Sequence, residues 1–232
     1  MPGKFTSDVH QMQPYVESRH KELPAVCGAR GMMSILTQID SVPQASLVTT
    51  FRAHPAINDL HNAVTYRGQL VSGTPAHHRS ALLNRVRCLN QDVPLVFIEV
   101  EGSSIRLPTG SHHNEQELQV YMSLITFLLQ RGFVSDQICI LSFYKEPPRR
   151  LEAVAQQHHI EVATVDSIQG REVDIVVVLI TRTNIREDTA EFIDDRLRIN
   201  VALTRHGLFI LGHVPLCRHP PWGAVTRWVI VN

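Results

Sequence analysis

A chain of 232 residues, of which 44% are hydrophobic and 19% are charged, has the composition of an ordinary soluble globular domain. Twenty-two Lys and Arg balance twenty-two Asp and Glu, so the net charge is zero and any site for a polyanion must be a local groove. This composition excludes wholesale disorder, and the chain has no run of about 18 apolar residues that would predict a membrane span.

The metal-binding residue types are scattered. The four cysteines form no CxxC pair, which argues against a zinc ribbon or a disulfide framework and favours reduced thiols in the cytoplasm or nucleus. The first residues lack a basic start followed by an apolar run, so no signal peptide is predicted. Thirteen histidines include pairs at 77–78, 112–113 and 158–159. Neither HExxH nor another ligand spacing accompanies them, so we expect loop or surface histidines and no metal site.

Residues 1–46 show no clear periodicity, but the pattern sharpens from Leu47 onward. Short apolar runs rich in β-branched residues predict buried strands, which cover residues 95–100, 137–143, 161–165, 174–181 and 207–213. Helical spacing predicts helices at 114–132, 148–158 and 196–204. The first of these should bury one face, made of Leu118, Tyr121, Met122, Ile125 and Leu128.

Strands that are apolar on both faces and alternate with helices predict a parallel sheet covered on two sides. The fold class is therefore α/β and doubly wound, with ligands expected at the strand ends. The proline-rich segment 215–232 is predicted to be a tail that leaves the domain.

The segment TVDSIQGREVDIVVV, residues 164–178, joins two predicted strands through a polar turn. Gly170 permits a close backbone approach, while Gln169 and Glu172 place polar groups at a strand edge. The alternative is a plain connector between strands, because Asp, Ser and Gly favour turns anyway. Asp166 and Asp174, in the same segment, are expected to make structural hydrogen bonds rather than act as a catalytic carboxylate pair.

Three arginines follow in the segment DDRLRINVALTRHGLFILG, residues 194–212. Arg196 and Arg198 are expected to pair with the preceding Asp194 and Asp195 on a solvated face. Arg205 stands at the end of the predicted helix, directly before a strand, where it could reach a phosphate across a cleft.

These two segments resemble motifs V and VI of superfamily 1 helicases of the Upf-type (Dna/Nam-like) family. VDSIQGREVD matches the pattern VDxxQGxExD at every fixed position, and RINVALTR matches RxNVALTRAR until its last step. Residues 50–70 resemble the family's YRMHP segment, residues 112–144 its NxxE helix and the next strand, and residues 7–16 a divergent motif III. The resemblance covers roughly residues 7–213.

The resemblance implies a RecA-like domain of the P-loop NTPase type, the second motor domain of a helicase, over residues 47–214. Residues 1–46 would be a remnant of the end of the first motor domain, and residues 215–232 a C-terminal tail. The implied function is that of the C-terminal half of an ATP-dependent RNA or DNA helicase, which shares its ATP site with an upstream RecA-like domain.

The matched motif positions also imply roles for single residues. Arg205 would be the arginine finger, Arg52 a second contact to the γ-phosphate, and Gln11 the sensor of the γ-phosphate state. Glu172 would accept from the ribose hydroxyls, and Gly170 would give backbone clearance.

The implied cofactor is ATP with Mg²⁺, and the implied partner is single-stranded RNA or DNA, with no membrane. The residues that would face the strand are Ser142, Tyr144, Thr164 and Ser167.

The sequence also departs from the family pattern. It has no GxxxxGK[ST] phosphate loop and no DEAxQ-type acidic motif, and we expect both to lie upstream of Met1. Two motif VI positions are missing after Arg205, including a second arginine, while Phe51 and Ala53 replace the usual tyrosine and methionine. The alternative function is a non-catalytic remnant that binds nucleic acid or serves as a scaffold. A nuclease or phosphatase is disfavoured because no cluster of carboxylates appears.

Overall fold

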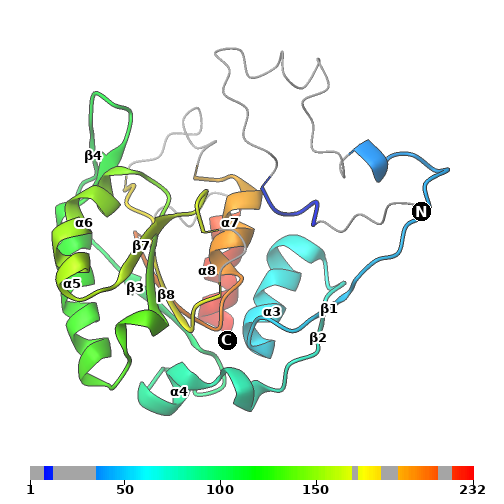
Figure 1. The fold of residues 1–232 in the computed structure, drawn as a ribbon, viewed down its shortest axis with the longest axis horizontal. Coiled ribbons are helices and arrows are strands. Elements are labelled where there is room, and N and C mark those ends of the chain that lie inside the picture. Colours follow the sequence, from blue (N-terminus) through cyan, green and yellow to red (C-terminus); the bar gives the residue numbers. More distant parts are fainter. Residues whose placement is uncertain (1–7, 13–34, 169–171, 184–192, 214–220) are drawn as a thin grey trace.

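A computed structural model describes residues 8–12, 35–168, 172–183, 193–213 and 221–232 of the chain. Its centre is a five-stranded parallel sheet with the strand order β3-β9-β8-β6-β7 (Figure 1). The strands are β3 (Leu95–Glu99), β9 (Gly207–Gly212), β8 (Ile175–Leu179), β6 (Ile138–Ser142) and β7 (Glu161–Thr164). The predicted α/β class, the parallel sheet and all five strands are confirmed.

The three inner strands are buried along their whole length. Every residue of β6, β8 and β9 is buried, whereas the edge strands β3 and β7 are partly exposed. Only strands covered on both faces need continuous apolar sequence, which explains why the inner strands lack the alternation of half-buried strands. Ile175 pairs with both Ile138 and Gly207, so the amino ends of these three strands are aligned.

One face of the sheet is covered by α3 (Pro55–His61), the π-helical turn η1 (Asn62–Tyr66), α7 (Arg196–Leu203) and α8 (Trp222–Val231). Ile57, Ile199 and Trp222 of this layer share a core cluster with Leu141 of β6 and Val176 of β8. The packing of this layer holds the helix that leads to Arg205 against the sheet (Figure 1).

The other face is covered by α4 (Ala81–Arg85), α5 (Glu115–Gln130) and α6 (Glu146–Gln157). Helix α5 begins where the Asn114 side chain accepts hydrogen bonds from the amides of Gln116 and Glu117, at 3.1 and 3.4 Å. Its predicted apolar face is wrong at Met122, which is 46% exposed, and Leu124 is buried instead. The buried stripe of α5 thus lies a little to one side of the predicted one.

Helix α8 corrects the predicted tail. Trp222 is 1% exposed, its Nε1 donates to the backbone oxygen of Ile193 at 2.9 Å, and its ring packs edge-on against Phe143. A tryptophan buried with its N–H satisfied is part of a core. The prediction of a tail that leaves the domain is therefore wrong for Trp222–Val231, which completes one layer of the domain.

Among the described residues, two pairs of short strands lie outside the five-stranded sheet. Strands β1 (Thr49–Thr50) and β2 (Val71–Ser72) pair in parallel, and β4 (Ile105–Arg106) and β5 (His112–His113) form an antiparallel hairpin. Two short 3-10 turns are η2 (Ala76–Arg79) and η3 (Ser135–Gln137). None of the helices in the described part of the chain is long and apolar enough to cross a membrane.

Candidate functional site

Three predicted residues from distant segments meet at the amino ends of β8 and β9. Glu172 precedes β8, Arg205 precedes β9, and Arg52 follows β1. The Nε of Arg52 lies 3.3 Å from Oε1 of Glu172, and the charge of Arg52 acts on the guanidinium of Arg205. The structure therefore brings Arg52, Glu172 and Arg205 into one cluster, which we call the arginine cluster.

The electrostatics of the arginine cluster favour an anion. Arg205 is only 2% exposed, and burial, followed by the repulsion of Arg52, lowers its pKa to about 10. A guanidinium with this pKa is still charged at neutral pH, so a buried cation sits beside a second one. A negatively charged ligand here would offset both the desolvation of Arg205 and its repulsion from Arg52.

Arg79 supports the arginine cluster from outside, although no sequence pattern singles it out. Its Nε donates to the backbone oxygen of Arg52 at 2.9 Å, and its NH2 donates to the backbone oxygen of Phe51 at 3.2 Å. The Thr74 hydroxyl also donates to Phe51 O, at 2.6 Å. These bonds fix the backbone that carries the Arg52 side chain.

Asp174, just before β8, forms hydrogen bonds to residues at the amino ends of β6 and β9. Its Oδ2 accepts from Gln137 Nε2 at 2.9 Å, its Oδ1 lies 3.2 Å from Nδ1 of His206, and its backbone oxygen accepts from Gly207 N. Burial is the main cause that lowers the pKa of His206. Together with Asp166, which accepts from Arg198 Nε at 2.9 Å, Asp174 makes the structural hydrogen bonds that we predicted for this pair.

Gln11 lies in a short segment that packs on the same layer. Its Nε2 donates to Asp8 Oδ2 at 3.3 Å, and the Tyr66 hydroxyl donates to the same carboxylate at 2.5 Å. Burial lowers the pKa of His61 to about 4, and the charges of Asp8 and Arg205 both act on this imidazole. His61 is therefore within electrostatic range of both Asp8, in the segment of Gln11, and Arg205. Gly170 lies outside the described residues.

The predicted strand-facing residues lie at the opposite, carboxyl ends of β6 and β7. Ser142 and Thr164 are cross-strand partners. Ser142 is fully buried, its hydroxyl accepts from Tyr144 N at 3.1 Å, and Tyr144 is buried as well. The Ser167 hydroxyl lies 3.0 Å from both the amide nitrogen and the carbonyl oxygen of Thr164. Of the four side chains, those of Thr164 and Ser167 reach the surface.

Helix α7 links the two ends of the sheet. At its start Asp195 caps the helix and pairs with Arg198 at 2.7 Å, which confirms the expected pairing of these two residues. Arg198 also contacts Asp166, two residues after Thr164, while the other end of α7 leads to Arg205. Helix α7 therefore spans from the strand-facing end of the sheet to the arginine cluster.

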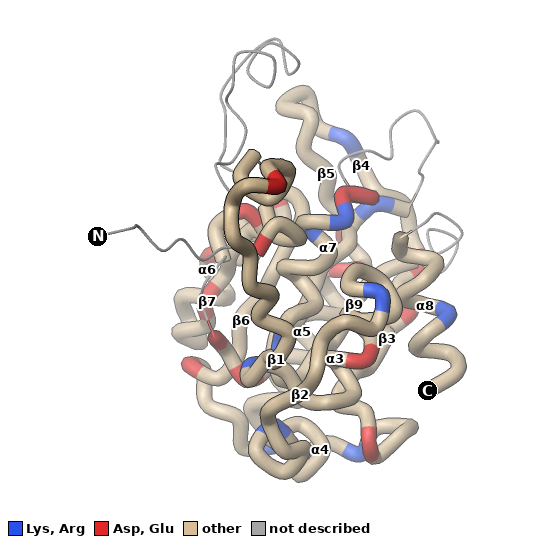
Figure 2. The backbone as a smooth tube through the Cα atoms, turned by 90° about the vertical axis from the view of Figure 1, so that its right-hand side faces the viewer, with Lys and Arg blue, Asp and Glu red and all other residues tan. Residues whose placement is uncertain are grey.

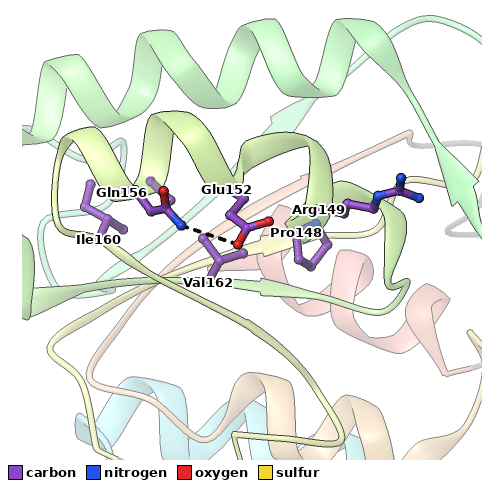
Figure 3. A pocket seen from close by; sticks show the side chains of 7 residues that line it. Pro148, Arg149, Glu152, Gln156, Ile160 and Val162 are labelled. Carbon is purple, nitrogen blue, oxygen red and sulfur yellow. Dashed lines mark hydrogen bonds between the residues drawn. The ribbon is translucent and has the colours of Figure 1, made fainter.

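A surface pocket lies between α6 and β7 (Figure 3). Its lining combines the apolar Ile160 and Val162 with polar side chains of α6, and Gln156 Nε2 donates to Glu152 Oε1 at 3.3 Å. None of the predicted site residues lines it. Within the described ranges, no three His, Cys, Asp or Glu side chains are grouped so that they could hold a metal ion.

The profile of a protein family described as an AAA domain matches residues 29–215, which is most of the chain. This match covers the arginine cluster and both ends of the sheet. The chain belongs to the Upf-type family of superfamily 1 helicases. Its fold is accordingly that of a RecA-like domain.

Curated relatives of this Upf-type chain include proteins named as helicases. It is 33% identical over 192 residues, 78% of the chain, to the 5'-3' DNA helicase ZGRF1 of Mus musculus. It is 31% identical over 192 residues, 77% of the chain, to regulator of nonsense transcripts 1 of Dictyostelium discoideum. It is 28% identical over 231 residues, 94% of the chain, to the ATP-dependent helicase upf1 of Schizosaccharomyces pombe. The aligned region spans 10%, 14% and 24% of these relatives, so the chain corresponds to a small part of each.

Proposed function

We propose that this chain is the C-terminal half of an ATP-dependent nucleic-acid helicase. In this proposal it supplies Arg52, Glu172 and Arg205 to an ATP site shared with an upstream RecA-like domain. The observation that carries the proposal is the convergence of these three residues, from segments far apart in sequence, with a buried guanidinium beside a second cation. The names of the relatives, which include an ATP-dependent helicase and a DNA helicase, support the same class of activity.

Phosphoryl transfer requires stabilisation of the charge on the transferred group, and the protein supplies little covalent chemistry. Arg205 would stabilise that charge in the transition state, and Arg52 would contact the γ-phosphate. Glu172 would accept from the ribose hydroxyls, with Gly170 leaving room for the nucleotide. The phosphate loop and the Mg²⁺ ligands would come from the upstream domain, and Gln11 would report the γ-phosphate state to it.

Thr164 and Ser167 would contact the backbone of a single strand at the carboxyl ends of β6 and β7. Their exposure supports this role, whereas Ser142 and Tyr144 would act through the local backbone because their side chains are buried. Such contacts follow phosphates and sugars and tolerate any base sequence. Helix α7 would couple this track to Arg205. The reduced cysteines expected for the chain favour the cytoplasm or nucleus as its location.

The proposal is tested by joining the chain to a RecA-like half that carries the phosphate loop and measuring phosphate release. Arg205→Ala should lower kcat by about 10³ to 10⁵ and leave ATP binding nearly intact, because the guanidinium acts on charge that develops in the transition state. Arg205→Lys should restore little, since an ammonium lacks the planar fork of donors. The chain alone should show no turnover. An active joined protein that is indifferent to Arg205→Ala would refute the assignment.

The shortened motif VI favours one second candidate, a non-catalytic remnant that binds nucleic acid or serves as a scaffold. The missing positions shorten the link between Arg205 and β9, which starts two residues later at Gly207. An Ala-Arg insertion after Arg205 in the joined protein separates the two candidates. Activity that appears only with the insertion identifies the natural chain as the remnant.

A further inference from the structure

The β4–β5 hairpin stands beyond the carboxyl ends of the sheet and is anchored there at two points (Figure 1). Before β4, Ser104 and Thr183 exchange hydrogen bonds of 2.8 and 3.2 Å between the backbone amide of each and the hydroxyl of the other. Before β5, the Ser111 hydroxyl accepts from Glu146 N at 3.0 Å. The hairpin is thereby fixed to the segments that follow β8 and β6.

The segment after β8 is itself held in an unusual conformation. Thr181 has a φ of 68°, which a β-branched residue rarely adopts. The buried Glu117 accepts from the amide and the hydroxyl of Thr181, each at 2.7 Å. These two bonds stabilise the strained residue and direct the next two, Arg182 and Thr183, toward the hairpin.

Positive charge gathers at the hairpin. Arg106 is exposed, and within the described residues no carboxylate forms an ion pair with it. Arg106 is the cross-strand partner of His112. The positive charges of Arg106 and Arg182 both disfavour protonation of that imidazole. Figure 2 shows a basic segment on β4 and, near α7, basic and acidic segments side by side.

The ring of His112 completes the arrangement. It lies 5.0 Å, centroid to centroid, from the ring of Tyr144, and its Nδ1 is buried without a hydrogen-bond partner among the described residues, so a ligand at the surface could reach only Nε2. Burial, then the charges of Arg182, Arg106 and His113, lower the pKa of His112 to about 4. The imidazole is therefore neutral at pH 7, where it can offer one N–H donor without adding charge.

We propose that the β4–β5 hairpin is a further contact site for single-stranded nucleic acid, in which Arg106 and His112 bind one backbone phosphate beside Tyr144. This inference rests on the proposed function, because it extends the track of Thr164 and Ser167 along the same ends of the sheet. The cross-strand register of Arg106 and His112 places an exposed cation and a neutral donor side by side. A phosphate accepts hydrogen bonds from both kinds of group.

The test compares Arg106→Gln and His112→Gln with the wild-type chain by fluorescence anisotropy. The probes are oligo(U) and oligo(dT) of about 12 nucleotides at several salt concentrations. Arg131→Gln is the matched control, because Arg131 is an exposed arginine at the other end of α5, with its guanidinium over the Phe127 ring. Equal melting temperatures establish that all variants are folded.

Arg106→Gln should weaken binding of both probes about 3- to 10-fold at low salt and reduce the slope of log Kd against log salt by about 0.7, the value for one phosphate contact. His112→Gln should weaken binding and leave the slope unchanged, because the lost group is neutral. Arg131→Gln should match wild type. If wild type binds and Arg106→Gln keeps its slope and affinity, the hairpin proposal fails while the proposed function stands. If wild type binds neither probe at low salt, both fail.

Discussion

Arg52 and Glu172 are 120 positions apart in the sequence, and they meet through a contact of 3.3 Å between Nε and Oε1. The residue expected to contact the ribose therefore also holds one of the residues expected to contact the γ-phosphate. Both side chains are partly exposed, so the ion pair itself contributes at most about 1 kcal/mol to stability. Its importance is that it orients Arg52 next to Arg205.

Glu172→Gln in the joined motor distinguishes the two roles of this carboxylate. We expect ATP to bind about 10-fold more weakly, because one charge-assisted hydrogen bond to the ribose is lost. Inorganic triphosphate has no ribose, and the amide oxygen of the glutamine can still accept from Arg52 Nε, so triphosphate should bind nearly as before. Competition against a fluorescent nucleotide measures both constants. Equal weakening of ATP and triphosphate would mean that Glu172 acts only through Arg52.

Arg79→Ala should lower kcat of the joined motor about 10- to 100-fold, because Arg79 fixes the backbone of Phe51 and Arg52. Arg79 would then be a positioning residue. The double variant with Arg52→Ala should be no slower than Arg52→Ala alone, since Arg79 would act through Arg52. Fully additive losses would instead indicate that Arg79 contacts the nucleotide itself.

Glu117→Gln should change how stability depends on pH. Burial raises the pKa of Glu117 from 4.5 to about 7, so between these values the folded chain keeps a proton that the unfolded chain has released. The stability that this group contributes is complete below about pH 4.5 and is lost as the pH rises through 7. Urea unfolding at pH 5 and pH 8 measures the effect.

Between pH 4.5 and about pH 7, the free energy of unfolding of the wild type should fall by about 3 kcal/mol more than that of Glu117→Gln. His61 and His112, whose pKa values are lowered, act in the opposite direction. They are present in both proteins, so the difference between the two isolates Glu117. A constant difference at pH 5 and pH 8 would contradict the prediction.

Trp222→Ala should destabilise the chain by about 3 to 5 kcal/mol, because it empties a buried site and leaves the Ile193 carbonyl without its donor. Ile230→Ala is the control on the same helix. Ile230 is 80% exposed, so its loss should change the free energy of unfolding by no more than about 0.5 kcal/mol. Chemical denaturation measures both, and similar small effects would show that α8 is not part of the core.

The sequence by itself determined the sheet and the family. Buried parallel strands need uninterrupted apolar residues, and runs such as Ile175–Leu179 carry that requirement locally. The motif V and VI segments likewise hold their information in a few consecutive residues. For this reason the strands, the fold class and the candidacy of Arg52, Glu172 and Arg205 could all be predicted.

Only the tertiary structure decided which side chains are accessible and which positions support the site. Arg79 donates hydrogen bonds to backbone carbonyls 27 and 28 residues away, and Trp222 donates to a carbonyl 29 residues away. No local sequence pattern could therefore predict the role of either residue. Ser142 is buried because helix layers cover both faces of the sheet around the inner strand β6. The packing of whole layers brings the partners of these side chains close. The apolar runs that build those layers, in contrast, consist of adjacent residues and can be recognised locally.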